Sequence, residues 1–355
     1  FYLPGFDKMW MIYGANGYTG ELIARKAVKD GQRPYLAGRD QSRIRPLAEE
    51  LNLPWRVFDL NNPAAVEAAL QDMSLVLHCA GPFSATSAPM VNACIATSTH
   101  YLDITGEIAV FEAIQLLDKA AKKANCLLLP GVGFDVVPSD CLASILAQQL
   151  PDATHLELAF CGEGGTSPGT IKTMIEMLGD GGRARVAGKI VKVPAAHKQK
   201  TIRFSSGEQW CMTIPWGDVS TAYYSTGIAN IEVYTAVPKQ AAMITRLLSP
   251  LLVVLKFKPL QNWLKRRVGK SIQGPSQAVR ESGTTRLWGR VSNAAGESRE
   301  ATLDIAEGYQ FTVAASTEIA YRIMESGFEA GAKTPSQLLG ANFVESIAGT
   351  QLRML

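Results

Sequence analysis

A chain of 355 residues exceeds the length at which a single hydrophobic core usually stops growing, so we expect two domains. Hydrophobic residues make up 47% and charged residues 19% of the chain, a composition that excludes intrinsic disorder. The four histidines show no HxxxH or HxxH spacing and the six cysteines no CxxC pair, so we expect no metal site and the reduced thiols of a cytoplasmic protein.

The first third of the chain alternates short apolar runs with stretches of helical spacing. The predicted strands are 9–13, 35–37, 55–58, 75–79, 101–104 and 126–129, and the predicted helices are 19–29, 41–51, 63–70, 90–96 and 110–122. This alternation is typical of βαβ units in a parallel sheet with helices on both faces. We therefore predict an α/β fold of the Rossmann type for residues 9–137, which end in a crossing rich in glycine and proline.

The second part of the chain has a different pattern. Strands are predicted at 156–160, within 185–204, and at 209–214, 285–291 and 301–305, with a hairpin loop at 292–297 and a helix start at Ser167-Pro168. This pattern predicts an α+β domain with a mixed or antiparallel sheet over residues 138–333. Thr334-Pro335 opens a last helical segment, 334–355, which we expect to return to the first domain.

The first predicted strand runs into the sequence MIYGANGYTGEL, which places glycines at positions 14, 17 and 20. Glycines at a strand-to-helix turn allow a tight turn, a close approach of the backbone to a pyrophosphate, and close packing of helix on strand. The N–H groups at the start of the helix then face the anion. The spacing predicts a dinucleotide site at Gly14, Asn16, Gly17, Tyr18, Thr19 and Gly20, with a glycine-rich turn that binds nothing as the alternative.

The second strand ends at Gly38-Arg39-Asp40, where an NAD site would place an acid against the ribose. Arg39 fits a 2′-phosphate better, because a guanidinium can pair with it bidentately, and Arg43 could help. Asp40 is the expected N-cap of the next helix. We therefore predict NADP(H) rather than NAD(H) as cofactor.

Two further segments complete the predicted cofactor site. Asp59 follows the third strand, where contacts near the adenine are made. A turn of small residues after the fourth strand would let the nicotinamide half pass, and it consists of Cys79, Ala80, Gly81, Pro82 and Phe83.

Candidates for proton transfer follow the later strands, because ligands of open parallel sheets bind at the carboxyl edge. The segment HYLDITGE offers Tyr101, Asp103 and Glu107 as a proton donor and carboxylates, and Asp135 in PGVGFDVVPSD is a further candidate. The alternative is structural: Asp103 or Thr105 caps the helix that begins near Glu107, Tyr101 packs in the sheet, and Asp135 organises its loop.

The positive charge is concentrated in the second half of the chain. Residues 181–207 carry seven Lys and Arg and residues 233–280 carry nine, in both cases without any Asp or Glu, which indicates an anionic partner. The basic and apolar segment 244–270 is too short and too interrupted by proline to span a membrane. From Pro259 it could form a helix with Leu260, Trp263 and Leu264 on one face, lying on an anionic membrane or packing internally or against a dimer partner.

The motifs GANGYTGEL, LAGRDQSRI, HCAGPFSATS, HYLDITGE and PGVGFDVVPSD resemble those of the saccharopine dehydrogenase-like oxidoreductases, in the lipid-associated branch that includes the trans-acting enoyl reductases. The resemblance implies an NADP-binding Rossmann domain, a second domain that covers the nicotinamide, and oxidoreductase activity. The GxxGxxG spacing departs from the GxGxxG of the lysine-pathway enzymes.

We therefore predict an NADP-dependent oxidoreductase that reduces a hydrophobic, lipid-like enoyl or carbonyl compound. It would be cytoplasmic, with a possible peripheral position at the inner face of a membrane and a possible homodimer, and with no nucleic-acid partner. The alternatives are a saccharopine-type amino-acid dehydrogenase and a non-catalytic NADP-binding sensor or scaffold.

Overall fold

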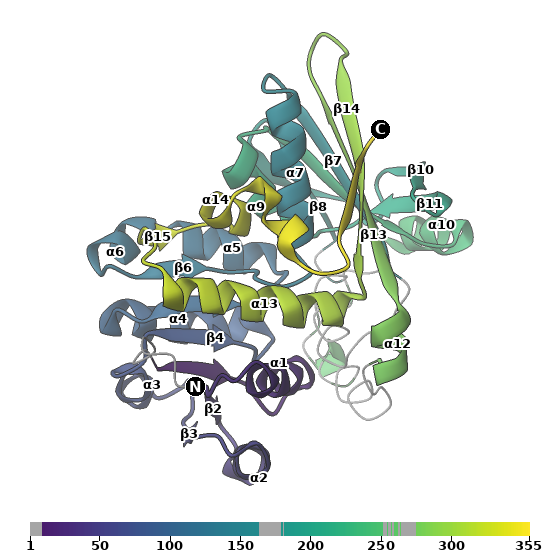
Figure 1. The fold of residues 1–355 in the computed structure, drawn as a ribbon. Coiled ribbons are helices and arrows are strands. Elements are labelled where there is room, and N and C mark those ends of the chain that lie inside the picture. The colour runs from purple at the N-terminus through teal and green to yellow at the C-terminus, as the bar shows by residue number, and fades with distance from the viewer. Residues whose placement is uncertain are drawn as a thin grey trace. The chain divides into compact units, whose positions relative to one another are not determined.

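The computed structural model describes residues 9–162, 179, 181–250, 254, 257, 259–261, 263 and 275–355. These residues divide into two compact units (Figure 1). The first unit contains residues up to Phe134 together with Thr312–Leu338, and the second contains Asp135–Phe311 and Leu339–Leu355. The chain thus leaves the first unit at Asp135, returns to it at Thr312 and leaves it again at Leu339.

The first unit is built on a parallel sheet, sheet A, which has seven strands in the described residues, in the order β15-β6-β5-β4-β1-β2-β3. The order reverses beside β1, between β2 and β4, as in doubly wound folds. The strands are β1 (Trp10–Tyr13), β2 (Tyr35–Gly38), β3 (Trp55–Val57), β4 (Leu75–His78), β5 (His100–Asp103), β6 (Leu127–Leu129) and β15 (Gly331–Ala332). The helices are α1 (Tyr18–Lys29), α2 (Gln41–Leu51), α3 (Pro63–Leu70), α4 (Phe83–Thr97), α5 (Ile108–Gln115), α6 (Asp118–Lys123), α13 (Gly308–Glu325), whose first turn belongs to the second unit, and α14 (Pro335–Leu339).

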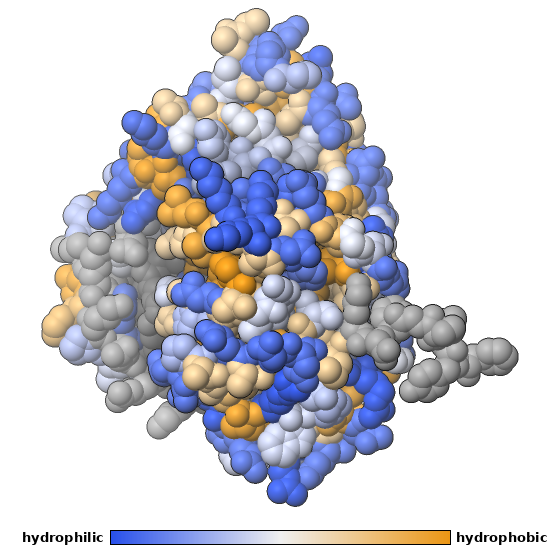
Figure 2. Space-filling view, turned by 90° about the vertical axis from the view of Figure 1, so that its left-hand side faces the viewer, coloured by the Kyte–Doolittle hydropathy of each residue, from blue (hydrophilic) through white to orange (hydrophobic). Residues whose placement is uncertain are grey.

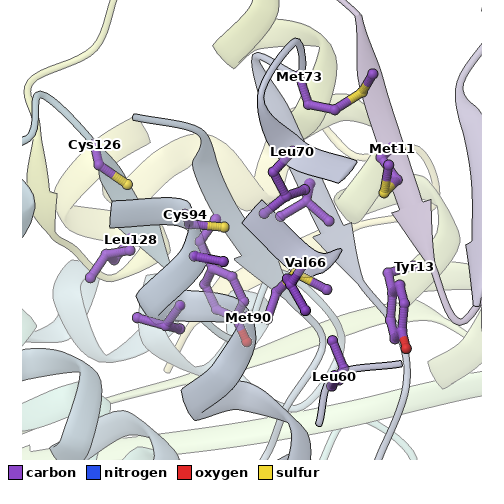
Figure 3. Close-up of a cluster of buried hydrophobic side chains, with 14 of the residues drawn as sticks. Met11, Tyr13, Leu60, Val66, Leu70, Met73, Met90, Cys94, Cys126 and Leu128 are labelled. Carbon is purple, nitrogen blue, oxygen red and sulfur yellow. The ribbon is translucent and has the colours of Figure 1, made fainter. Parts of the chain in front are cut away.

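Helices cover both faces of sheet A because its strands are apolar on both sides. Met11 and Tyr13 of β1 lie in a buried cluster with Val66 and Leu70 of α3 and Met90 of α4 (Figure 3). The neighbouring residue Trp10 points to the other face, where its ring meets that of Tyr321 of α13, with 6.1 Å between centroids. The late helix α13 is therefore part of the first unit's core.

The second unit is built on a mixed sheet, sheet B, in which β7 and β12 pair in parallel and the other pairs are antiparallel. Its strands are β7 (His155–Gly162), β8 (Gly182–Val186), β9 (Lys189–Val193), β10 (Gln199–Phe204), β11 (Gly207–Thr213), β12 (Asn230–Ala236), β13 (Thr284–Ser292), β14 (Ser298–Ala306) and β16 (Gln351–Met354). Its helices are α7 (Val137–Gln149), α9 (Asp218–Thr226), α10 (Lys239–Leu248), α12 (Gln277–Ser282) and the 3-10 helix η2 (Ala341–Ser346).

Helix α7 covers one face of sheet B at close range. A Cβ on Gly289 of β13 would lie only 2.7 Å from a methyl carbon of Leu146 and 3.2 Å from Leu142. A glycine in the middle of this strand thus permits the helix to approach. Beyond it, β13 and β14 form the predicted hairpin, closed by a loop in which Gly296 has a φ of +87°.

The predicted fold class is confirmed: a parallel sheet with helices on both faces is followed by a unit with a mixed sheet. Three element predictions need correction. Helix α4 begins at Phe83 rather than Met90, and it contains Pro89. The predicted helix 110–122 is two helices, α5 and α6.

The third correction concerns residues 334–355, which we expected to be helical and to return to the first unit. Only Thr334–Leu338 lie there, whereas 339–355 belong to the second unit. Gln351–Met354 form β16, which pairs with β14 at the edge of sheet B. The C-terminal residues therefore belong to the second unit because they pair with a strand of sheet B.

Hydrophobic residues form several separate areas among hydrophilic ones on the face drawn in Figure 2. No helix in the described parts of the chain is long and apolar enough to cross a membrane. The predicted helix start at Ser167-Pro168 lies outside the described residues, as does most of the predicted segment 244–270.

Candidate functional site: the carboxyl edge of sheet A

The turn after β1 has room for glycine alone at two positions. Gly14 has a φ of +81°, and a Cβ there would lie 2.8 Å from the Cβ and backbone nitrogen of Ala80. A Cβ on Gly20 would lie 2.4 Å from the carbonyl oxygen of Gly14. The three segments after β1, at the start of α1 and after β4 are therefore packed backbone to backbone.

Helix α1 begins without a side-chain cap. Its N-cap is Gly17, which has extended backbone and whose N–H donates to the Gly14 carbonyl at 2.9 Å. Tyr18 and Thr19, the first two residues of the helix, are half-buried. The glycine N-cap makes no side-chain hydrogen bond to the first N–H groups of the helix, which suits an incoming anion, and Glu21, the acidic residue of the first turn, pairs with Arg25.

The end of β2 is joined to the glycine turn through Asn16. A Cβ on Gly38 would lie 3.0 Å from the side-chain oxygen of Asn16 and 2.9 Å from Ile44 of α2. The Arg43 guanidinium donates to the Asn16 carbonyl at 3.3 Å. The structure therefore brings the predicted residues after β1 and β2 together.

Asp40 is occupied as the N-cap of α2, as the sequence predicts. Its carboxylate accepts hydrogen bonds from the Ser42 N–H at 3.0 Å and the Ser42 hydroxyl at 2.6 Å. The hydrogen bond from the Ser42 hydroxyl, together with the nearby charges of Arg43 and Arg39, lowers the pKa of Asp40. The acid at this edge thus serves the helix, while Arg39 is exposed.

Asp59 and Arg39 both act on the hydroxyl of Tyr13. Burial and the negative charge of Asp59 together raise the pKa of Tyr13 to about 12, against the opposing positive charge of Arg39. Asp59 also accepts hydrogen bonds at 2.9 Å from the backbone and side chain of Asn61. The ends of β2 and β3 therefore carry one cation and one anion close to the end of β1.

The turn after β4 is held by two side chains. The Thr86 hydroxyl donates to the Ala80 carbonyl at 2.7 Å, with the Pro82 carbonyl at 3.1 Å. The Glu107 carboxylate accepts hydrogen bonds from the N–H groups of Phe83 at 2.9 Å and Ser84 at 2.7 Å, the first residues of α4. Glu107 thus occupies the N-terminus of α4 with a negative charge, in contrast to the uncapped α1.

His78 is a residue of this edge that the sequence interpretation treated as ordinary. It is fully buried, and its Nε2 lies 3.0 Å from the Thr86 hydroxyl oxygen. Because the single hydrogen of that hydroxyl is directed to the Ala80 carbonyl, we assign the ring hydrogen to Nε2. Nδ1 has no hydrogen-bond partner among the described residues, and burial lowers the pKa of His78 to about 3. The signal in the sequence was a polar residue within the apolar strand LVLHC.

Tyr101 and Asp103 are fully buried and bound to each other. The Tyr101 hydroxyl donates to Asp103 Oδ2 at 2.6 Å, while Oδ1 accepts from the N–H groups of Thr105 at 3.0 Å and Gly131 at 2.8 Å. Burial raises the pKa of Asp103 to about 6, although these hydrogen bonds oppose the shift. The Thr105 hydroxyl in turn accepts the Glu107 N–H at 3.1 Å. These contacts match the structural alternative for the segment, and a direct catalytic role stays a prediction.

Asp135 belongs to the second unit. It is half-buried, and its carbonyl accepts a hydrogen bond from the Trp216 indole at 2.9 Å. Asp218 is fully buried nearby, and its pKa is raised well above the usual range by burial and by the charges of Asp140 and Asp135. The role of Asp135 in a reaction also stays a prediction. No group of three or more His, Cys, Asp or Glu in the described part of the chain is arranged to hold a metal ion.

Comparison with known families assigns this first unit. Residues 10–129 match the family model of the saccharopine dehydrogenase NADP binding domain. Residues 10–129 are therefore similar to that domain family. The match supports a nicotinamide dinucleotide as the cofactor of this domain, and the start of α1, where no side chain caps the helix, fits its pyrophosphate.

The curated relatives include two groups of mycobacterial proteins. A putative trans-acting enoyl reductase of Mycobacterium tuberculosis is 32% identical over 184 residues, which cover 47% of this chain and 43% of that protein. A trans-acting enoyl reductase of Mycobacterium leprae is 34% identical over 138 residues, which cover 37% of this chain and 33% of that protein. The chain thus matches less than half the length of either relative.

Among solved structures, the apo saccharopine dehydrogenase (L-Glu forming) of Saccharomyces cerevisiae has a similar fold. The TM-score is 0.64 at 12% sequence identity, over 98% of this chain and all of that one. At this identity the similarity shows the fold of the chain and says nothing of its substrate.

Proposed function

We propose that the protein is an NADP-dependent oxidoreductase that reduces a hydrophobic enoyl or carbonyl compound. The observation that carries the proposal is the glycine turn at an uncapped α1, beside Arg39 and Arg43, in a domain of a dinucleotide-binding family. A bound nicotinamide supplies or accepts a hydride. The chain's own residues would hold the cofactor, orient it and keep water away.

The preference for NADP(H) rests on the end of β2. An acid that bonds the ribose 2′-hydroxyl is the usual mark of an NAD site. Asp40 is engaged instead as the cap of α2, whereas Arg39 is exposed next to it and Arg43 reaches the glycine turn. Two guanidinium groups at this edge support binding of a 2′-phosphate.

The polar residues after β4 and β5 support a positioning role. Glu107 fixes the first turn of α4, and Thr86 fixes the turn at Ala80 and Pro82, where the nicotinamide half would pass. Tyr101 and Asp103 join the end of β5 to Gly131 and are fully buried. We propose that these residues shape the floor of the site, and that Asp135 is the remaining candidate for proton transfer.

The proposed substrate class rests on the relatives that are named trans-acting enoyl reductases. A saccharopine-type amino-acid substrate is supported only by the fold likeness. The test is the absorbance of NADPH at 340 nm with fatty enoyl thioesters, with lipid carbonyl compounds, and with 2-oxo acids plus amino acids. We expect oxidation with one of the first two. Oxidation only with the amino-acid mixture would favour the saccharopine-type alternative, and tight binding without any turnover would favour a sensor.

Replacing Arg39 tests the cofactor preference. We expect Arg39→Ala to weaken NADPH binding about tenfold, the loss of one charge-assisted contact, and to leave NADH binding nearly unchanged. Arg43→Ala should act in the same direction. Tryptophan fluorescence titration with each cofactor measures both affinities.

Arg45→Ala is the matched control for this experiment, because Arg45 lies on α2, the helix that follows Arg39 and carries Arg43, but pairs with Glu49 at 2.7 Å. Equal losses in the Arg39 and Arg45 variants would show a general charge effect. An unchanged ratio of NADPH to NADH affinity after Arg39→Ala would refute the assignment of the 2′-phosphate to this edge.

A peripheral contact with an anionic membrane stays a separate proposal. The residues that would make this contact lie in the second unit and are not part of the cofactor site. A homodimer likewise stays a proposal.

A further inference from the structure

Helix α10 packs against the second unit through the side that carries Ala242. Ala242 is its buried residue, and the Ala242 carbonyl accepts a hydrogen bond from Gln199 of β10 at 3.2 Å. At its end, the Ser249 hydroxyl accepts the N–H of Ala195 at 2.8 Å. At its start, the Lys239 ammonium lies 4.6 Å from the ring centre of Trp210 of β11. These contacts fix which side of the helix faces the protein.

The large apolar residues of α10 lie on the opposite side. Met243, Ile244 and Leu247 follow Ala242 by one, two and five positions, which at 3.6 residues per turn places them away from it. Their exposed fractions are 58%, 56% and 78%, and that of Leu248 is 41%. We call these four residues the α10 apolar face. A helix of a globular protein normally packs such a face against the core, so we expect a binding partner to cover the α10 apolar face.

The positive charge on α10 indicates which kind of surface binds to the α10 apolar face. Lys239 and Arg246 are exposed on the same helix, and the chain has no acidic residue from 233 to 280. A second copy docked face to face would bring these cations against their own equivalents, which is unfavourable. An anionic phospholipid surface matches both features, because it offers acyl chains to the apolar residues and phosphates to the cations.

Further described residues along the chain continue this pattern. Val254, Phe257 and Trp263 are 56%, 64% and 52% exposed. Aromatic residues of this kind favour the boundary between headgroups and acyl chains.

We infer that α10 is a membrane-docking helix that lies in the headgroup region of an anionic bilayer, with Met243, Ile244 and Leu247 at the acyl boundary and Arg246 at the phosphates. This role goes beyond the proposed redox function. The cofactor site of the first unit does not depend on it.

The test is co-flotation of the full chain with vesicles of phosphatidylglycerol and phosphatidylcholine, and with phosphatidylcholine alone. We expect binding to the anionic vesicles that weakens as salt is added. Leu247→Glu should reduce the bound fraction about tenfold, since it replaces an inserted leucine by a negative charge that the anionic lipid repels. The matched control is Leu116→Glu, the same change at an 86% exposed leucine of the first unit, and it should bind as the wild type does.

NADPH titration of each variant shows whether the fold and the cofactor site are intact, so that failure of the docking role is distinguishable from failure of the redox proposal. Absence of wild-type binding to anionic vesicles would overturn the inference, as would equal binding by the Leu247 and Leu116 variants. Light scattering tests whether a second copy of the chain covers the α10 apolar face. A wild-type dimer that becomes monomeric in the Leu247→Glu variant, without lipid binding, would assign this face to a second copy instead.

Discussion

His78 and Asp103 stand side by side in register at the ends of β4 and β5, and burial shifts their pKa values in opposite directions. The pKa of His78 falls to about 3, so the ring stays neutral in the folded protein. The pKa of Asp103 rises to about 6, with the Tyr101 hydroxyl as the main opposing contact. Both groups therefore make stability depend on pH, with opposite signs.

The signs follow from which state binds the proton. Between about pH 3 and 6.5 the unfolded chain protonates His78 and the folded chain does not, so this residue's contribution to stability is lost as the pH falls. Between about pH 4 and 6 the folded chain holds the proton of Asp103 more tightly, so that contribution is lost as the pH rises. From pH 4 to 6 the two contributions oppose each other.

Separate replacement of the two residues should expose each slope. We expect Asp103→Asn to make the free energy of unfolding rise more steeply from pH 4 to 6 than in the wild type, and His78→Gln to make it rise less steeply or fall. Each difference should reach at most about 1.4 kcal/mol per pH unit, the limit for one proton. Urea unfolding at several pH values measures the slopes, and two variants with the wild-type slope would contradict the assigned burial of both groups.

The sequence predicted the local geometry of the glycine turn better than the contacts of the polar residues. Gly14 and Gly20 could be predicted because backbone conformation and close approach restrict those two positions to glycine. The roles of Tyr101, Asp103 and Glu107 could not, because they depend on burial and on partners in other strands. The Glu107 carboxylate binds backbone N–H groups 24 and 23 positions earlier in the chain, and no local pattern records such a contact.

At the scale of elements, α4 shows how a distant residue sets a helix start. Pro89 in the middle of its sequence favoured a start at Met90, since proline is best tolerated in a helix's first turn. The helix begins at Phe83 because the Glu107 carboxylate accepts the first two N–H groups and adds a favourable charge at that end. The same turn carries the Cys79–Phe83 part of the candidate site.

Removing this cap should weaken both the helix and the site. We expect Glu107→Gln to lower the free energy of unfolding by about 1–2 kcal/mol, because an amide offers one acceptor and no charge to two N–H groups. NADPH affinity should fall in parallel. Chemical denaturation and fluorescence titration measure the two effects.

Glu67→Gln on the exposed side of α3 is the control for net charge. If it lowered stability as much as Glu107→Gln, the effect would come from net charge and not from the cap. Full stability of the Glu107 variant would show that water replaces the carboxylate at the helix start.

At the scale of the whole molecule, the alternation of apolar runs was enough to predict sheet A from β1 to β6. It could not predict β15, because the two residues Gly331–Ala332 carry no strand pattern and are ordered by pairing with β6. The Asp118 carboxylate supports this pairing by accepting the Ala332 N–H at 3.0 Å. The domain limit proposed at 137 lies close to the end of the first part of this unit at Phe134, whereas the limit at 333 did not anticipate that Thr312–Leu338, with most of α13 and β15, belong to the first unit.

Because the candidate cofactor site lies in the first unit, we expect NADPH to stabilise that unit. At about a hundredfold excess over its dissociation constant, NADPH should stabilise the cofactor-binding unit by about 2.7 kcal/mol. Hydrogen exchange measured by mass spectrometry should show slower exchange at Gly14–Gly20, Gly38–Arg43 and Cys79–Phe83. The hairpin of β13 and β14 serves as the internal reference. Uniform slowing in both regions, or none at the glycine turn, would contradict the assignment.

The return of the chain to the first unit has a consequence for protein engineering. A fragment cut after residue 129 would leave the edge of β6 bare, without β15, and would strip α13 from Trp10, so it is a poor choice for an isolated cofactor domain. The Phe134 N–H donates to the Thr312 hydroxyl at 3.0 Å, so the two ends of the excursion meet. A short splice from Phe134 to Thr312, with the chain ended at Leu338, would delete the second unit and keep every strand of sheet A, yielding a minimal nucleotide-binding module as a contiguous gene product.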